Sequence, residues 1–290
     1  MKKCIVCLIL ILLIWVSNTG FIFNNKSTFN ITFIDVGQGD SALIECDKHY
    51  MLIDGGDKDH GNAVYDVLRK NDAKHLDILV ASHEHKDHIG GFPKALMYVT
   101  RIDKALCNTN SSINVPFQQF INTLSLYKTR ITVPKVGDQY SLGSAIVKIL
   151  DVGDPNSDNG SIVLQITYGE TTFLFTGDMG HDQETLFCNT YNEETSFFEK
   201  IFNKKNPPRG FSLLKVAHHG SDTSSSTAFI TMVSPEYSVI SVGQDNGYGH
   251  PDDITLSTLL KAGSKIYRTD RNGNIMVSSD GQKLVVKTSK

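Results

Sequence analysis

Short apolar runs that end in glycine or polar residues dominate the first half of the chain from residue 29 onward. Each run is rich in β-branched or aliphatic residues and is too short for a typical helix, so we expect strands. Apolar residues on one helical face, at Val64, Val67 and Leu68, predict a helix among them, and residues 90–99 predict another. The expected strands are 30–36 (NITFIDV), 41–46 (SALIEC), 50–56 (YMLIDGG) and 76–82 (LDILVAS).

The same pattern returns in the second half of the chain. Residues 161–178 (SIVLQITYGETTFLFTGD) predict a hairpin of two strands around a glycine turn, and the hairpin ends in an aspartate. Residues 211–221 (FSLLKVAHHGS) and 237–243 (YSVISVG) predict further strands, with a turn and helix cap at 221–227 (SDTSSST) between them. This alternation indicates an α/β fold, in which ligands bind at the carboxyl ends of the strands.

Composition favours one globular domain, expected at residues 29–290. The chain has 290 residues, of which 40% are hydrophobic and 20% are charged, so neither a disordered chain nor a multi-pass membrane protein is indicated. The net charge of -3 lacks the strongly basic balance of many nucleic-acid-binding proteins. A local basic group does occur at 199–210 (EKIFNKKNPPRG), and its simplest interpretation is a solvated loop.

Residues 1–22 predict an export segment. Two lysines precede an unbroken apolar run from Cys4 to Val16, which matches a secretory signal better than a membrane span of ~20 residues. Small and polar residues follow, but the apolar residues at 21–23 lengthen the stretch, so cleavage and retention as a membrane anchor both stay open. The expected location is extracellular or at the cell surface, with membrane contact through this segment if it is retained. No protein partner is predicted.

The strongest chemical signal is the stretch 82–91 (SHEHKDHIGG), which begins as the last expected strand of the first half ends. His83, His85, Asp87 and His88 form the pattern H-x-H-x-D-H. Imidazoles two residues apart in an extended loop point the same way, so His83 and His85 can share one metal ion. Asp87 and His88 then turn toward a second ion. Imidazole nitrogens and carboxylate oxygens suit zinc, manganese or iron.

Two further groups at strand ends in the second half complete the expected two-metal site. Asp178 ends the hairpin, where a buried carboxylate without a partner would be costly, so we expect it to bridge the two ions. His218 and His219 end the next strand. One of them is expected to be a ligand and the other a substrate contact or proton donor, in an order that the spacing leaves open. Two ions a few ångströms apart would activate water and hold the scissile group.

Eight motifs in this order resemble the metallo-β-lactamase superfamily, and specifically the hydrolase domain of ComEC-type competence proteins. They are FIDVGQGDSALIE, LIDGG, SHEHKDHIGG, DNGSIVLQITYG, FLFTGD, LLKVAHHGS, SVGQDNGYGHP and IYRTDRNGNI. The resemblance covers residue 31 to about residue 277, and it implies a four-layer αββα sandwich with a dinuclear metal site between two sheets. It implies the following ligands: His83 and His85 for the first ion, Asp87 and His88 for the second, Asp178 as the bridge, and the His218/His219 pair as the closing ligand.

One part of the chain departs from the superfamily pattern. Many members supply a further histidine to the first ion just before the second-half hairpin, where this chain reads GDPNSDNGS. Asp158 or Asn159 is the nearest substitute. An oxygen ligand there would weaken the first site and shift its preference toward harder ions such as manganese. We therefore expect two divalent ions, zinc or manganese.

Supporting or catalytic roles are expected for three other positions of the motifs, and a second role is expected for Asp87. Asp40 and Asp54 are expected to hydrogen-bond ligand imidazoles and fix their tautomers, although both also suit plain turn positions. Asp87 is expected to orient the attacking hydroxide while it ligates. His250 in GYGHP is expected to contact the substrate or act as a general acid, although these residues also suit a turn before a helix.

A phosphodiester is the substrate class that such a site serves best, and the resemblance implies cleavage of DNA outside the cell. A phosphoester hydrolase of the phosphorylcholine-esterase type at the cell surface is the alternative, and the near-neutral charge slightly favours it. A non-catalytic binding module is a third hypothesis, which would predict gaps among the ligand residues. The sequence has none of these gaps.

Overall fold

The structure is a computed structural model that describes residues 28–157, 160–202 and 210–290, with side chains described except at 192–202. The expected export segment, Asp158, Asn159 and the side chains of the basic group at 199–209 therefore lie outside the described residues. Within the described ranges, no helix combines the length and the apolar character needed to cross a membrane.

The strands form two mixed β-sheets. The first sheet contains β1 (Phe29–Phe33), β2 (Ala42–Cys46), β3 (His49–Ile53), β4 (His75–Ala81), β5 (Arg101–Cys107), β6 (Ile131–Thr132), β14 (Ile275–Ser279) and β15 (Leu284–Thr288). The second contains β7 (Gln139–Leu142), β8 (Ala145–Asp151), β9 (Val163–Tyr168), β10 (Thr171–Phe175), β11 (Leu213–Lys215), β12 (Tyr237–Ile240) and β13 (Lys265–Arg268). Their orders are β15-β14-β1-β2-β3-β4-β5-β6 and β13-β12-β11-β10-β9-β8-β7.

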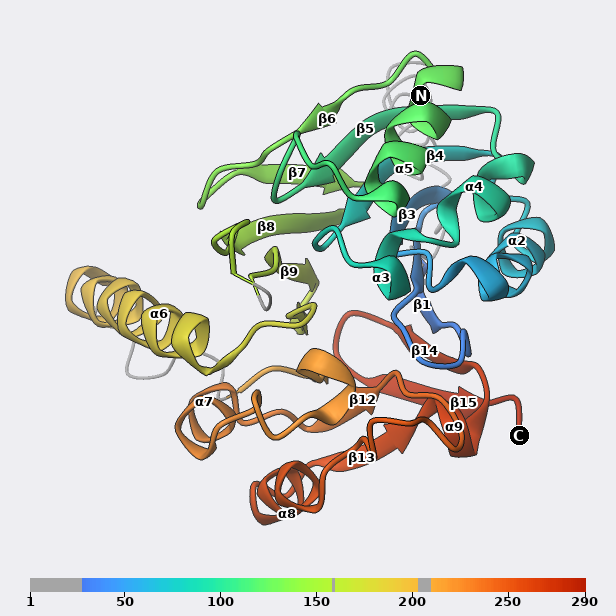
Figure 1. Ribbon diagram of the computed structural model, residues 1–290. Helices are drawn as coiled ribbons and strands as arrows, with labels where there is room; N and C mark the ends of the chain where they lie inside the picture. The colour runs from blue at the N-terminus through green and yellow to red at the C-terminus, as the bar shows by residue number, and fades with distance from the viewer. Residues whose placement is uncertain (1–27, 158–159, 203–209) are drawn as a thin grey trace, which may run out of the picture.

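Helices cover the outer faces of both sheets. The first sheet carries α2 (Gly61–Lys70), α3 (Lys86–Ile89), α4 (Phe92–Ala95) and α5 (Val115–Leu126), and the second carries α6 (His181–Phe202), α7 (Thr227–Val233) and α8 (Asp253–Lys261). The short helix α9 (Thr269–Asn272) follows β13. Figure 1 shows the two groups of helices on opposite sides of the strands. The predicted four-layer αββα sandwich is thus confirmed.

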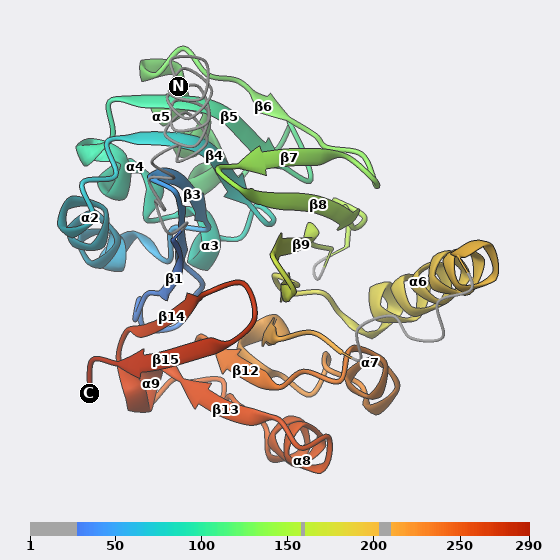
Figure 2. The ribbon, with the colours of Figure 1, turned by 180° about the vertical axis from the view of Figure 1, so that it is seen from behind.

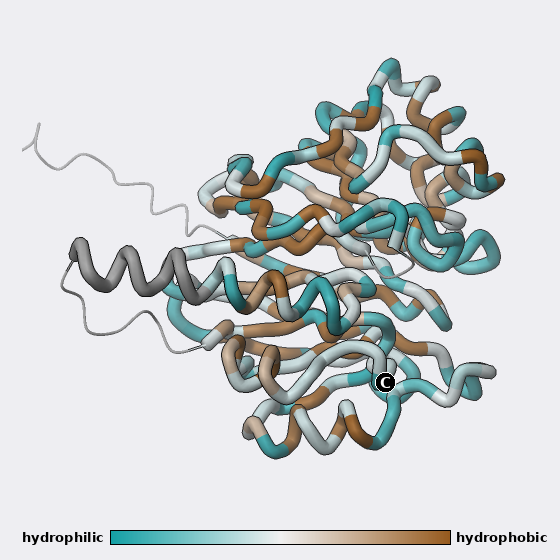
Figure 3. Tube along the Cα trace, turned by 60° about the vertical axis from the view of Figure 1, so that its left-hand side comes forward, coloured by the Kyte–Doolittle hydropathy of each residue, from teal (hydrophilic) through white to brown (hydrophobic). Residues whose placement is uncertain are grey.

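Aromatic residues hold the two sheets together. Phe29 and Phe33 point inward from alternate positions of β1, and their rings stack on Phe173 at 4.8 Å and on Phe175 at 5.7 Å between ring centroids. Such pairs contribute about 0.5–1.5 kcal/mol each beyond their buried area. Apolar residues accordingly fill the middle layers, whereas surface loops are largely hydrophilic (Figure 3). This packing fixes the position of each sheet relative to the other, and therefore also the positions of the strand ends.

Parallel pairing gathers the functional loops at one edge. Strands β3, β4 and β5 run parallel in the first sheet, and β10, β11, β12 and β13 run parallel in the second. Phe175 is in register with Lys215, which is in register with Val239, so β10, β11 and β12 end at the same level. The loops that follow these strands therefore meet, as expected for ligand sites in α/β sheets.

Two features differ from the expectations or extend them. The helix expected at residues 90–99 is shorter, because α4 ends at Ala95 and a single 3-10 turn follows at Leu96–Tyr98. The C-terminal hairpin of β14 and β15 returns to the first sheet and pairs antiparallel with β1, as seen in Figure 2. The last two strands therefore form one edge of the first sheet.

The helix cap expected within residues 221–227 is present, because Ser226 caps α7.

Candidate metal centre

The first group of metal donors consists of His83, His85 and Asp178. Each offers one nitrogen or oxygen, and these three atoms lie within 4.8 Å of one another. His83 and His85 come from the loop after β4 and their rings are 4.4 Å apart, whereas Asp178 follows β10 in the other sheet. His83 and Asp178 are buried, so this group is assembled only when the two sheets pack.

The second group consists of Asp87, His88 and His219, whose donor atoms also lie within 4.8 Å of one another. Asp178 lies between the two groups, because its Oδ2 is 3.2 Å from His88 Nε2 and 3.7 Å from His83 Nε2. This is the position that a bridging carboxylate requires.

Several of these donor atoms have no hydrogen-bond partner among the described residues. They are Nε2 of His83 and Oδ1 of Asp178, both buried, and Nε2 of His88, whose contact with Asp178 Oδ2 at 3.2 Å is an ion pair. Buried polar atoms in proteins are nearly always paired, and an orphaned one costs about 1–3 kcal/mol. Imidazole nitrogens and carboxylate oxygens that converge without partners are the donors that divalent metal ions take. The residues present therefore fit the two ions that the fold implies.

Without metal, neighbouring carboxylates favour protons on two of the imidazoles, whereas burial disfavours charge on a third. Burial and the neighbouring His88 hold the pKa of His83 well below its usual value. Burial also disfavours charge on His88 and His219, but neighbouring carboxylates, Asp178 first among them, raise the pKa of His88 well above its usual value and that of His219 to about 10. Although burial opposes it, these imidazoles hold the pKa of Asp178 well below its usual value. Metal ions would replace these protons at the second group.

Hydrogen bonds behind the donors orient the imidazoles. His88 Nδ1 is 2.9 Å from Asp54 Oδ2, the contact expected for Asp54, and Ser82 donates its hydroxyl to the same carboxylate at 2.7 Å. Ser82 Oγ and Ser161 Oγ lie 3.1 and 3.3 Å from His83 Nδ1, and Ser161 Oγ also accepts from the Asp178 N–H at 2.9 Å. Such contacts fix the ring orientation and leave Nε2 for the metal.

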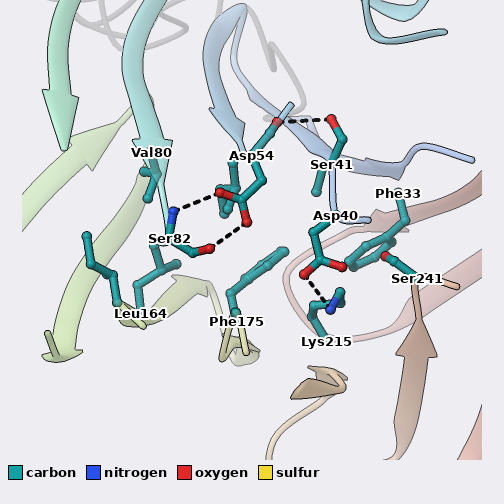
Figure 4. A pocket seen from close by; sticks show the side chains of 14 residues that line it. Phe33, Asp40, Ser41, Asp54, Val80, Ser82, Leu164, Phe175, Lys215 and Ser241 are labelled. Carbon is teal, nitrogen blue, oxygen red and sulfur yellow. Dashed lines mark hydrogen bonds and ion pairs between the residues drawn. The ribbon is translucent and has the colours of Figure 1, made fainter. Parts of the chain in front are cut away.

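Asp40 and Lys215 form a second support, of which the sequence pattern predicts only Asp40. Asp40 Oδ1 is 3.3 Å from His219 Nδ1, an ion-pair contact in place of the expected hydrogen bond, because this nitrogen pairs with the Ser241 carbonyl oxygen at 3.0 Å. Asp40 Oδ2 is 2.6 Å from Lys215 Nζ (Figure 4). Lys215 also donates to the Val216 carbonyl at 2.7 Å. The role of Lys215 is not predicted by the sequence because this residue stands within an apolar strand pattern. The roles of Ser82 and Ser161 are not predicted either. All three residues stand inside motifs quoted above, and this was the available signal.

The adjacent histidines His218 and His219 have different surroundings. His219 is buried, its Nδ1 is 3.0 Å from the Ser241 carbonyl oxygen, and its Nε2 is 3.2 Å from Asp87 Oδ2. His218 is 27% exposed, and its Nε2 is 3.9 Å from Asp178 Oδ2. Both have positive φ, at 48° and 55°, and such strain in non-glycine residues concentrates at functional sites. The geometry thus favours His219 as the ligand, since it belongs to a donor group, and His218 lines the cavity beside it.

An open cavity of about 320 Å³ lies over the two donor groups. His250 borders it with its side chain 12% exposed, and its Nε2 is 3.8 Å from Asp252 Oδ2. Burial and then the nearby His218 lower the pKa of His250. His250 thus lies at the cavity wall outside both donor groups, and its expected catalytic role stays a prediction. The extra oxygen ligand expected at Asp158 or Asn159 also stays a prediction, because both lie outside the described residues.

Sequence similarity to known proteins covers most of the chain. The family model for the metallo-beta-lactamase superfamily matches residues 154–244. ComE operon protein 3 of Bacillus subtilis is 26% identical over 271 residues, which are 86% of this chain and 33% of that protein. Competence protein ComA of Neisseria gonorrhoeae is 30% identical over 245 residues, 84% of this chain and 31% of that protein. The chain thus spans about a third of the length of these curated relatives.

Solved structures share the fold at low sequence identity. The metallo-beta-lactamase fold protein YhfI from Bacillus subtilis matches with a TM-score of 0.58 and 12% identity, covering 87% of this chain and 100% of that one. CmlA from Streptomyces venezuelae, a diiron beta-hydroxylase, matches with a TM-score of 0.53 and 13% identity, covering 83% and 52%. The chain therefore carries a metallo-β-lactamase domain, the fold of a superfamily of metal-dependent hydrolases, and its curated relatives are competence proteins.

Proposed function

We propose that the protein is a dinuclear-metal-dependent phosphodiesterase that cleaves DNA outside the cytoplasm. The observation that carries the proposal is the position of Asp178 between the two donor groups, directly beneath an open cavity. Two adjacent ions suit an in-line displacement at phosphorus, because both the attacking and the leaving oxygen carry negative charge.

The residues around the cavity have complementary tasks in this reaction. Bound divalent ions would supply charge stabilisation and make water more acidic. Asp87 stays ionised because His219 and His88 outweigh the effect of burial and lower its pKa, so its carboxylate can accept a hydrogen bond from the attacking water. His218 presents Nε2 to the cavity, where it can contact a phosphoryl or leaving oxygen. Lys86 is exposed at the cavity edge and offers a cation to a neighbouring phosphate.

The DNA substrate and the location rest on separate supports. Similarity to competence proteins over most of the chain supports a nucleic-acid substrate. The apolar segment within residues 1–22 supports export. The alternative, a phosphorylcholine-type esterase at the cell surface, is supported by the near-neutral charge of the chain.

A substrate panel tests the proposal. Protein reconstituted with manganese or zinc is assayed on single-stranded DNA, duplex DNA and a phosphorylcholine ester, with His85→Ala as the matched control. We expect DNA hydrolysis that the control lacks. Turnover of the phosphorylcholine ester alone would select the alternative, and a metal-loaded protein that cleaves none of the three would overturn both.

A further inference from the structure

The rim of the cavity carries an exposed aromatic ring that the reaction described above does not use. Tyr248 lines the cavity and is 68% exposed, and one of its faces stacks on His250 with ring centroids 5.7 Å apart and an angle of 24° between the planes. A large apolar ring left this open at the mouth of a functional cavity exposes a face that a planar ligand could cover.

The loop that carries Tyr248 is held in place by Asn246. The side-chain oxygen of Asn246 accepts from the backbone N–H groups of Tyr248 at 3.2 Å and His250 at 3.1 Å. Its side-chain nitrogen donates to the carbonyl oxygens of Gly243 at 3.0 Å and His250 at 2.7 Å. One side chain thus ties both ends of the turn together, and such pre-ordering reduces the entropy that a ligand must remove.

A row of rings connects this rim to the metal donors. The centroid of His250 is 5.8 Å from that of His218, and His218 Nε2 is 3.9 Å from Asp178 Oδ2. A ligand whose reacting group lies at Asp178 could therefore extend along His218 and His250 and place a flat group on Tyr248. Lys86 also lines this cavity and would attract an anionic ligand.

We propose that Tyr248, supported by His250, is a stacking subsite for the nucleobase next to the scissile phosphate. This inference rests on the proposed phosphodiesterase function and adds the recognition of a base to it. Base stacking on one aromatic side chain tolerates any sequence, which suits a nuclease without base-specific hydrogen bonds. A choline headgroup fits less well, because its recognition uses a cage of several aromatic rings and Lys86 would repel it. Tyr248 is the one Phe, Tyr or Trp among the described residues that line the cavity.

Kinetics on paired substrates test this subsite. Wild type, Tyr248→Ala and Tyr248→Phe are compared on a single-stranded oligonucleotide and on the same strand with abasic sites in place of its bases. We expect Tyr248→Ala to raise KM about tenfold on the base-bearing strand with little change in kcat, and by less than about twofold on the abasic strand. Tyr248→Phe keeps the ring and should retain the wild-type KM. Leu260→Ala, which removes a 64% exposed side chain outside the cavity, is the matched control.

A binding measurement separates failure of the subsite from failure of the proposed function. A phosphorothioate strand that resists cleavage carries 2-aminopurine, whose fluorescence is quenched by stacking, and is titrated with metal-loaded protein. Quenching by wild type and Tyr248→Phe but not by Tyr248→Ala supports the subsite even if no phosphodiester is hydrolysed. Four results would overturn the stacking subsite. They are equal KM changes on both strands, equal quenching by all variants, no quenching by wild type, and a loss of activity in Tyr248→Ala that is confined to phosphorylcholine esters.

Discussion

Lys215 Nζ lies 2.6 Å from Asp40 Oδ2, and both side chains are buried behind His219. Burying two charges is costly, so this pair is not expected to add net stability. It instead keeps a carboxylate 3.3 Å from His219 Nδ1, which also pairs with the Ser241 carbonyl oxygen, and so helps to hold the ring with Nε2 toward the second ion.

Removal of one partner should therefore be more damaging than removal of both. Lys215→Met removes the nearest cation from the buried Asp40 and leaves it only the 3.3 Å contact with His219, so we expect the free energy of unfolding to fall by about 3 kcal/mol. The double variant Asp40→Asn with Lys215→Met should recover most of that loss, as measured by urea unfolding of metal-free protein. Its affinity for the second ion should still be about 10- to 100-fold weaker than in wild type, by isothermal titration. If the double variant binds metal with wild-type affinity, the Asp40–Lys215 pair does not position His219.

Asp178 and His85 should differ in how many ions their loss removes. His85 belongs to one donor group and is partly exposed, so His85→Ala should abolish activity, retain one ion per chain and leave the fold intact. Asp178→Asn should weaken both sites, because Asp178 faces both groups. Elemental analysis after dialysis gives the stoichiometry, and circular dichroism reports the fold. One ion retained by Asp178→Asn would argue against a bridging role.

Substitutions of His218 and His219 should have different effects on metal content in the same assay. His219→Ala removes a donor of the second group and should lower metal content together with activity. His218→Ala should retain both ions while kcat falls by about 100-fold, the usual range for loss of a group that assists proton transfer. The reverse pattern, with metal loss on changing His218 alone, would exchange the two assignments.

Gly39 should tolerate no side chain. Its φ is +147°, and a Cβ atom there would overlap the carbonyl oxygen of Asp87, which also accepts the Asp40 N–H at 3.1 Å. We expect Gly39→Ala to lower the free energy of unfolding by about 1–3 kcal/mol and to weaken the second ion. Gly247→Ala, whose added Cβ meets no atom within 4 Å, is the stability control and should change it by less than about 0.5 kcal/mol. Equal unfolding energies for both variants would refute the close approach.

The sequence predicts the α/β strands and the groups of donor residues at their ends because both depend on local patterns, whereas the four-layer arrangement follows from the family resemblance. Strand β4 is a continuous apolar run, and the H-x-H-x-D-H loop follows it directly, so the donors could be placed at a strand end before the fold was known. The hairpin of β9 and β10 likewise delivers Asp178 where the pattern 161–178 places it.

Features that depend on distant partners could not be predicted in this way. Lys215 interrupts an apolar strand, and only its pairing with Asp40 in the other half of the chain explains how its charge is buried. The C-terminal hairpin pairs Asn30 with Ser278, a contact that no local periodicity specifies. The order of His218 and His219 depends on an unusual backbone conformation that their spacing does not reveal.

A metal titration tests whether the protein is a metal-dependent phosphodiesterase. Protein stripped with a chelator is assayed on bis-p-nitrophenyl phosphate while manganese or zinc is added back in measured steps. We predict no turnover without metal and a rise in rate that saturates at two ions per chain. Protein that binds two ions per chain and still hydrolyses no phosphodiester would contradict the account.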